Sequence, residues 1–371
     1  MKQRILVVFG TRPEAVKLAP VIAELRRHPA QFEVIVCLTG QHRQMVDDVV
    51  SLFRIRIDHD LSVMTANQNL AGLTSRLFSE LDVLTGKVHP DWTVVQGDTT
   101  TAMVAATTAF YRGVRIGHVE AGLRTLDLRQ PFPEEFNRRV ADIVADAYFA
   151  STAGARENLL REGVSDERIA VTGNTGIDAL LEVAERSYDW TAGPLRLLDE
   201  ARRLVVVTAH RRESFGEPFR KLCLGIRDLS TRFPDTDFVY PVHLNPNVQS
   251  VAREIMCGLG NLHLLPPVDY LTMVKLLQRA FLVITDSGGI QEEAPSFGCP
   301  ILVARETTER PEAVSAGFAT LVGTDPDRIT SAGAAMLSRG RVETRIHAAN
   351  PFGDGHASQR IAAHLARAVR P

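Results

Sequence analysis

Short runs of β-branched and aliphatic residues recur along the chain, and a stretch with helical spacing separates each run from the next. The runs are ILVVF, FEVIVCL, WTVVQ, RIGHV, AYFAS and RIAVTG, and then RLVVVT, FVYPVH, LHLLPP, FLVIT, PILVA and ATLVG. Strands that are covered on both faces read as continuous apolar runs, and their alternation with helices is typical of βαβ units. The pattern therefore predicts an α/β protein with mostly parallel sheets.

The chain has 371 residues, a length that suits two domains. The stretches RILVVFGTRPE and RLVVVTAHRRE echo one another, since each runs from a basic residue through a strand into a loop with Arg and Glu. We expect an N-terminal Rossmann-like domain over 1–176 and a C-terminal one over 177–353, with a final helix at 354–371 that packs back on the first. Ligands bind beyond the carboxyl ends of such strands, so two facing domains would line a cleft with their βα loops.

Charge and cysteine content exclude several classes of protein. The formal net charge of −2 provides no field that would draw the chain to nucleic acid or to an anionic membrane. The four cysteines are far apart and form no CxxC pair, which argues against a disulfide scaffold or a zinc site. The first apolar run is too short for a signal peptide, and no run reaches the length of a membrane span. We expect a cytoplasmic protein.

The corner GTRPEAVKLAP joins the first strand to the first helix. Pro13 suits the first helical turn, and Arg12 would stand at the positive end of the helix with Lys17 one turn further along. Cations beside helix N–H groups form an anion site, although Arg12 paired with a surface carboxylate is the alternative. Glu14 reads as a helix-start carboxylate, and Pro20 predicts a kink or a division of the helix.

The stretch VITDSGGIQEEAPSFG gives the strongest phosphate signal. A strand ends just before the small residues 287–289, which open a short helix. Glycine lets a phosphate approach the backbone N–H groups, and the helix dipole favours its charge, so a diphosphate is the expected ligand. Glu292 and Glu293 follow, where a carboxylate can bind ribose hydroxyls or merely complement the dipole.

The stretch TAHRRESFG places three basic residues after the first strand of the second half. His210, Arg211 and Arg212 would suit a diphosphate leaving group, because arginine binds phosphate in a bidentate way. A solvated run of charge is the alternative.

Acidic residues mark three stretches of the first half: QGDTTT, GHVEAGLRT and PFPEEFNRR. Asp98 and Glu120 follow strands directly, so we expect them at the same edge of the sheet. Carboxylates that converge can divide into a base and an acid, as proton transfer near neutral pH requires, although a single such acid is more often a helix cap. Glu135 reads as a helix-start carboxylate, and Arg138 is a candidate to reach the cleft.

Several cofactor and nucleophile motifs are absent from the sequence. It contains no GxxxxGK[ST] loop, no complete GxGxxG, no HExxH and no GxSxG elbow. Asp235 and Asp237 imitate a metal-binding pair but precede a strand, and we interpret them as turn residues. No nicotinamide cofactor, metal or covalent hydrolase chemistry is indicated.

Eight motifs stand in order between residue 4 and about residue 360: GTRPEAVKLAP, QGDTTT, GHVEAGLRT, PFPEEFNRR, TGNTGIDAL, TAHRRESFG, YPVHLNPNV and DSGGIQEEAPSFGCPILVARETTERPEAV. In these motifs the chain resembles the UDP-N-acetylglucosamine 2-epimerases of the bacterial non-hydrolysing type. The resemblance implies a glycosyltransferase-B-like fold, with two Rossmann-like domains facing across a cleft that holds the nucleotide sugar. It also implies a homodimer and no cofactor, while the net charge of −2 leads us to expect no contact with nucleic acid or membrane.

The resemblance further implies a reversible inversion at carbon 2, which converts UDP-N-acetylglucosamine to UDP-N-acetylmannosamine for cell-surface polysaccharide. In the family's route a base removes the carbon 2 proton as UDP leaves carbon 1, and 2-acetamidoglucal remains. UDP then adds back, with the proton delivered to the other face. The chemistry requires two groups that transfer protons and a cationic cradle for the diphosphate.

The resemblance also implies a role for each residue of this chain that matches a motif of the family. The implied catalytic residues are Asp98, Glu120, Glu134 and His210, and the implied UDP-binding residues are Arg12, Lys17, Arg138, Ser287, Gly288, Gly289, Glu293 and Arg310. A regulatory site for a second nucleotide sugar would involve Gln41, His42, Gln44, Arg211 and His243, although Asn67 stands where some relatives have an arginine. The competing hypotheses are a hydrolysing 2-epimerase that releases N-acetylmannosamine and UDP, a glycosyltransferase of the same fold, and a non-catalytic sensor of nucleotide sugars.

Overall fold

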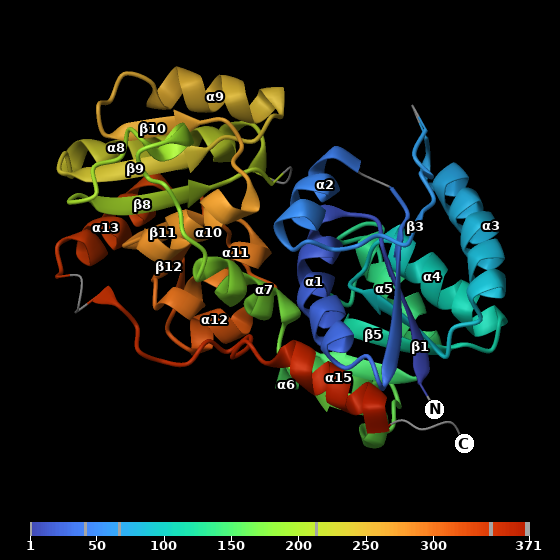
Figure 1. Ribbon diagram of the computed structural model, residues 1–371. Coiled ribbons are helices and arrows are strands. Elements are labelled where there is room, and N and C mark those ends of the chain that lie inside the picture. The colour runs from blue at the N-terminus through green and yellow to red at the C-terminus, as the bar shows by residue number, and fades with distance from the viewer. Residues whose placement is uncertain (1, 41–42, 66–67, 212–213, 341–343, 368–371) are drawn as a thin grey trace. The chain divides into compact units, whose positions relative to one another are not determined.

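The computed structural model describes residues 2–40, 43–65, 68–211, 214–340 and 344–367. The chain divides into two compact units (Figure 1). Unit 1 comprises Met1–Ala179 and Phe352–Pro371, and unit 2 comprises Leu180–Pro351.

Unit 1 contains a parallel sheet of seven strands in the order β3-β2-β1-β4-β5-β6-β7. The strands are β1 (Gln3–Phe9), β2 (Phe32–Leu38), β3 (His59–Asp60), β4 (Trp92–Gln96), β5 (Arg115–Ala121), β6 (Ala147–Ala150) and β7 (Ile169–Val171). The helices are α1 (Arg12–Arg27), α2 (Arg43–Leu52), α3 (Leu70–Val88), α4 (Thr100–Tyr111), α5 (Glu134–Val144), α6 (Ala153–Arg161), α7 (Thr175–Ala184), which crosses into unit 2, and α15 (Ala357–Arg367). A short 3-10 helix spans Asp166–Arg168.

Unit 2 contains a second parallel sheet, in the order β10-β9-β8-β11-β12-β13. Its strands are β8 (Arg203–Thr208), β9 (Thr236–Pro241), β10 (Leu262–Leu265), β11 (Leu282–Thr285), β12 (Ile301–Val303) and β13 (Ala319–Leu321). Its helices are α8 (Glu217–Arg232), α9 (Pro246–Met256), α10 (Tyr270–Arg279), α11 (Gly288–Glu293), α12 (Pro311–Ser315) and α13 (Pro326–Leu337), and 3-10 helices span Gly193–Leu195 and Ala294–Phe297. The predicted α/β class with two parallel sheets is confirmed, because every apolar run singled out in the sequence forms a strand.

The strand order of each sheet reverses once, and loops that carry predicted site residues follow the strands at each reversal. In unit 1 the order turns between β1 and β4, whose register pairs Ile5 with Trp92. In unit 2 it turns between β8 and β11, whose register pairs Thr208 with Thr285. Crevices at such switch points, beyond the carboxyl ends of the strands, are where doubly wound sheets bind ligands.

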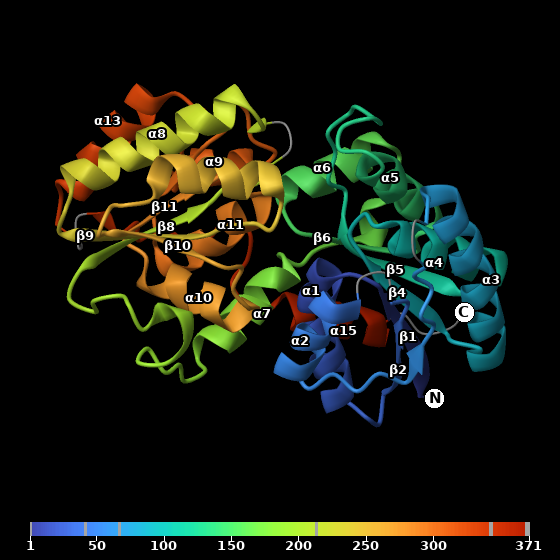
Figure 2. The ribbon, with the colours of Figure 1, turned by 90° about the horizontal axis from the view of Figure 1, so that it is seen from above.

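Helices cover both faces of the unit 1 sheet (Figure 2). Leucines of α3 and alanines of α4 form one buried cluster with Leu6 and Val8 of β1. On the other face α15 packs against α1. Asp178 of α7 fixes the start of α15, since its Oδ1 accepts hydrogen bonds from the Ser358 backbone nitrogen at 2.8 Å and hydroxyl at 2.7 Å.

The first helix contains the proline for which we expected a kink or a division. α1 runs without interruption from Arg12 to Arg27, with Pro20 buried in its interior, so the helix is not divided and the kink stays a prediction. Burial of this helix against the sheet and α15 outweighs the loss of one backbone hydrogen bond.

Candidate active site

Glu120 lies at the carboxyl end of β5 and is the most enclosed of the three predicted catalytic acids. It is 8% exposed, and its backbone has a φ of +67°. Lys17 Nζ donates to both of its carboxylate oxygens, at 2.6 and 2.7 Å, and the Gln96 side-chain amide donates to Oε2. The structure therefore places Lys17, predicted as a diphosphate ligand, against a predicted catalytic acid.

Asp98 follows β4, the neighbour of β5, as the parallel-sheet argument predicts. Its carboxylate pairs with Arg138 of α5, and its backbone oxygen accepts a hydrogen bond from Asn137 Nδ2 at 3.0 Å. Arg138 also contacts Glu135 Oε2 at 3.3 Å. Helix α5 therefore holds the loop that carries Asp98.

Glu134 and Glu135 open α5, where the helix dipole favours a carboxylate. Glu134 is half-buried. Glu135 is completely buried and accepts a hydrogen bond from the Thr125 backbone nitrogen at 3.1 Å. Its role is therefore more than the helix-start carboxylate that we expected, because it joins α5 to the loop after β5.

A buried ionic network that no motif of the sequence predicts lies beneath these acids. His118 of β5 has its Nδ1 2.6 Å from Asp142 Oδ1 and its Nε2 2.8 Å from the Gly97 carbonyl oxygen. The other oxygen of Asp142 contacts Arg124 at 2.8 Å and accepts from the Gly122 backbone nitrogen at 3.2 Å. Burial lowers the pKa of His118, but Asp142 and Gly97 outweigh it and leave that pKa raised. Because both partners of the ring are acceptors, the geometry fits an imidazolium.

The corner between β1 and α1 is organised by Glu14, whose side chain is buried. It accepts hydrogen bonds from the backbone nitrogens of Gly10 at 3.0 Å and Thr11 at 2.8 Å. Its Oε1 also accepts from the Thr99 hydroxyl at 2.6 Å, and burial raises the pKa of Glu14. Thr99 follows Asp98 directly, so Glu14 joins the Arg12 corner to the loop of a predicted catalytic acid.

In unit 2 the predicted phosphate loop follows β11, and Ser287 is the N-cap residue of α11. The guanidinium groups of Arg310 and Arg211 lie 3.7 and 3.8 Å from the position that a Cβ would take on Gly288. Arg310 pairs with the buried Glu292, so one of the two carboxylates considered for ribose binding already forms an ion pair within the protein. The other, Glu293, lies 3.5 Å from the Tyr270 hydroxyl.

His210 and Arg211 follow β8, the strand next to β11, so these two of the three predicted basic residues lie at the switch point of unit 2. The third, Arg212, lies outside the described residues. The His210 ring stacks on that of His243, with 5.4 Å between centroids and an angle of 11°. Burial is the largest cause of a lowered pKa at His210, and His243 and Arg211 lower that pKa further, whereas Asp286 raises it.

A family model described as UDP-N-acetylglucosamine 2-epimerase matches residues 23–366. The chain belongs to this family. It is 47% identical over 365 residues to the UDP-N-acetylglucosamine 2-epimerase of Escherichia coli K12, a match that covers 96% of this chain and 97% of the relative. It is 42% identical to the enzyme of the same name from Campylobacter jejuni, with 97% of each chain covered.

Solved structures agree with this assignment. The crystal structure of UDP-GlcNAc 2-epimerase from Neisseria meningitidis bound to UDP-GlcNAc is 41% identical, with a TM-score of 0.89 and coverage of 98% of this chain and 100% of that one. The structure of the Methanocaldococcus jannaschii UDP-GlcNAc 2-epimerase is 30% identical, with a TM-score of 0.83 and coverage of 98% and 99%. A glycosyltransferase of kitacinnamycin, 14% identical with a TM-score of 0.61, shares the fold alone. The glycosyltransferase-B-like fold class is thereby confirmed.

The resemblance to the epimerase family also implied a regulatory site, and the structure describes only some of its residues. Gln41, His42 and Asn67 lie outside the described residues, as does the side chain of Gln44. Of the two others, His243 stacks on His210, and Arg211 lies 3.7 Å from Glu309.

The described part of the chain offers neither a metal-binding cluster nor a membrane-spanning helix. Within it, no three His, Cys, Asp or Glu side chains are grouped to hold a metal ion, and no helix is long and apolar enough to span a bilayer. The interpretation of Asp237 as a turn residue is wrong, because it lies buried in β9 and its Oδ1 is 3.3 Å from both Arg202 and His263.

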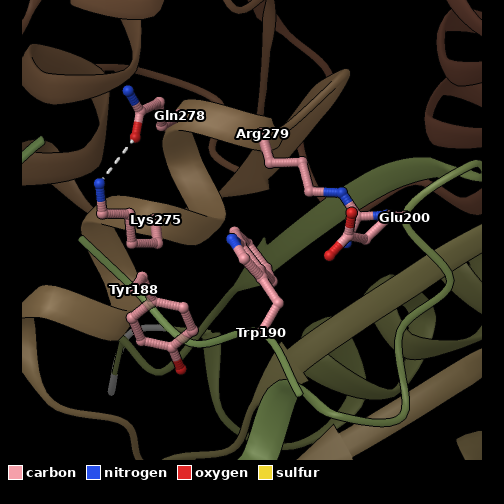
Figure 3. Close-up of a pocket in the computed structure, with 6 residues that line it drawn as sticks. All are labelled: Tyr188, Trp190, Glu200, Lys275, Gln278 and Arg279. Carbon is pink, nitrogen blue, oxygen red and sulfur yellow. Dashed lines mark hydrogen bonds between the residues drawn. The ribbon is translucent and has the colours of Figure 1, made fainter. Parts of the chain in front are cut away.

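A cavity of about 340 Å³ in unit 2 is separate from the predicted site of this epimerase-family chain (Figure 3). It is lined by Tyr188, Trp190, Glu200, Lys275, Gln278 and Arg279. The Arg279 guanidinium lies over the Trp190 ring at 5.2 Å. Because α10 ends at Arg279 and β11 begins at Leu282, the cavity lies near the amino end of that strand, opposite the phosphate loop.

Proposed function

We propose that this chain interconverts UDP-N-acetylglucosamine and UDP-N-acetylmannosamine by elimination of UDP and its re-addition. The observation that carries the proposal is the edge of the unit 1 sheet, where Glu120 and Asp98 end neighbouring strands and each is held by a cation. Carboxylates held in fixed positions at adjacent loops provide the two groups that transfer protons at carbon 2. Glu134, at the start of the helix that holds Asp98, is the third proposed acid.

The proposed chemistry assigns the diphosphate to unit 2. As the bond from carbon 1 to oxygen breaks, its electron pair moves to the β-phosphate oxygen, where negative charge grows. Backbone N–H groups at 288–289 and the side chains of His210 and Arg310 would stabilise that charge, and Glu293 would bind the ribose. From unit 1, we propose Arg12 as a further cation for the diphosphate.

One incubation tests the reaction and its main rival. The protein is mixed with UDP-N-acetylglucosamine in deuterated water, and the products are separated and analysed by mass spectrometry and proton NMR. We expect UDP-N-acetylmannosamine with deuterium at carbon 2 and little free sugar. N-acetylmannosamine that appears at the rate of UDP would identify a hydrolysing enzyme, and epimer without deuterium would contradict the elimination route.

We also propose a homodimer that forms through unit 1. α4 packs against both α3 and α5. Near the C-terminal ends of these helices the exposed fractions of large apolar side chains are 69% for Val83, 57% for Phe110, 74% for Tyr111 and 79% for Ile143. Apolar side chains gathered on one face are typical of subunit interfaces. Light scattering after gel filtration should give a dimer for the natural chain and a monomer for Ile143→Arg, and equal masses would contradict this face as the interface.

A further inference from the structure

Asp286 is a buried carboxylate at the switch point of unit 2 to which the proposed function gives no role. It follows β11, and its side chain is 1% exposed. Its Oδ2 accepts hydrogen bonds from the backbone nitrogens of His210 and Arg211, both at 2.8 Å. One carboxylate oxygen therefore joins the His210 loop to the phosphate loop.

The other oxygen of Asp286 is unusual. Oδ1 is buried and makes no hydrogen bond to any described residue. His210 Nδ1 lies 3.8 Å from it, just beyond hydrogen-bond distance. A buried acceptor without a partner is rare in folded proteins and calls for a functional explanation. Here the atom faces the ring of a proposed catalytic residue.

We propose that Asp286 is the positioning residue of His210: its Oδ1 accepts a hydrogen bond from Nδ1–H of the ring, so that Nε2–H is directed to the leaving diphosphate. This inference rests on the proposed function, in which His210 stabilises the negative charge that develops on UDP. No net proton transfer is required, because Nε2–H donates a hydrogen bond to the phosphate oxygen that receives the electron pair. Among the described residues, the titratable and charged groups around the ring are Asp286, His243 and Arg211, and of these only Asp286 stabilises an imidazolium.

The substitution Asp286→Asn reverses the polarity of this contact and keeps its shape. The asparagine oxygen can still accept from the two backbone nitrogens. Its amide nitrogen then takes the place of Oδ1 and can only donate, so it favours a ring that lacks the Nδ1 proton. The same carboxylate-to-amide change in the triad of serine proteases costs about 10⁴ in kcat. We expect kcat to fall at least about tenfold while KM stays within about threefold.

A matched control separates this role from general damage to unit 2. Asp237 is also a buried aspartate beside a histidine, since its Oδ1 lies 3.3 Å from His263 Nε2. Asp237 is paired with Arg202 and belongs to no part of the proposed site. Asp237→Asn is expected to lower thermal stability and to leave kcat unchanged. Equal losses of kcat in Asp237→Asn and Asp286→Asn would overturn the inference.

A double-mutant cycle tests whether Asp286 acts through the ring. In a His210→Gln background, Asp286→Asn should lower kcat no further, because the two residues form one unit. Losses that multiply would overturn the inference. A large loss in His210→Gln with none in Asp286→Asn would also overturn it and leave the proposed function intact. Unchanged turnover in His210→Gln would remove His210 from the mechanism, and the role of Asp286 with it.

The protonation of the ring provides a readout besides activity. With UDP bound to the natural protein, ¹⁵N NMR of labelled histidine should show His210 protonated at Nδ1. The same measurement on Asp286→Asn with UDP should show Nδ1 without its proton. An identical His210 spectrum in both proteins would overturn the inference. Calorimetry serves as the folding control, because a variant that still binds UDP is folded.

Discussion

Replacing His118 by phenylalanine tests whether the ionic network beneath the acids holds unit 1 together. Phenylalanine keeps an aromatic ring in a fully buried position but removes both polar contacts of the imidazole. Asp142 then keeps Arg124 as a partner and loses the ring at 2.6 Å, and the Gly97 carbonyl loses its donor at 2.8 Å. Removing one partner of a buried ion pair costs about 3–5 kcal/mol.

The expected change in unfolding temperature follows from the size of the unit. Unit 1 has about 200 residues, and unfolding entropy near 60 °C is about 2.1 cal/mol/K per residue. The entropy of unfolding is then about 0.4 kcal/mol/K, so a loss of 3–5 kcal/mol lowers Tm by about 7–12 °C.

Tryptophan fluorescence can follow unit 1 by itself, because the chain has two tryptophans and they lie in different units. Trp92 lies in β4 of unit 1, so a Trp190→Phe background makes the signal report that unit alone. Arg156→Gln is the control, since Arg156 forms an equally short ion pair of 2.6 Å with Asp166, but at an exposed site. Its Tm should stay within about 2 °C of the parent. A shift that small for His118→Phe would refute the structural role of the network.

Two further predictions concern the acids and pH. Asp98→Asn, Glu120→Gln and Glu134→Gln should each lower turnover by about 10²–10⁴ while UDP still binds in calorimetry, and unchanged turnover in any one removes that residue from the mechanism. Folding raises the pKa of His118. The protonated ring therefore contributes fully to the stability of unit 1 below the ordinary histidine pKa of about 6.5, and this contribution is lost as pH rises through the pKa of the folded state. The Tm of unit 1 should therefore lie furthest above that of His118→Phe at low pH, and a constant difference up to pH 9 would contradict the raised pKa.

The sheets could be predicted from the sequence because buried parallel strands leave a pattern that is local in the chain. β3 was not predicted, since a strand of two residues, His59–Asp60, leaves no such pattern. The convergence of Asp98 and Glu120 followed from strand order alone, because parallel strands end at one edge.

The partners of these residues could not be predicted in the same way. We expected Lys17 to bind a phosphate, but it pairs with Glu120. Which acceptor a flexible lysine side chain reaches depends on the three-dimensional structure and not on the local sequence. Glu14 looked like a local helix-start carboxylate because its bond to Thr99 crosses 85 positions of the chain. His118 and Asp286 lie in or beside apolar strands, where one polar residue carries no signal of its partner.

The placement of α15 has a consequence for biosynthesis. Unit 2 is continuous in the chain and ends at residue 351, whereas unit 1 needs α15 to complete the face of its sheet that α1 begins. A ribosome releases the chain from its N-terminus, so all of unit 2 emerges before α15 does. Unit 1 is therefore translated first but completes its fold last. Until α15 has been synthesised, the apolar face of α1 and the Asp178 carboxylate lack their partners in that helix.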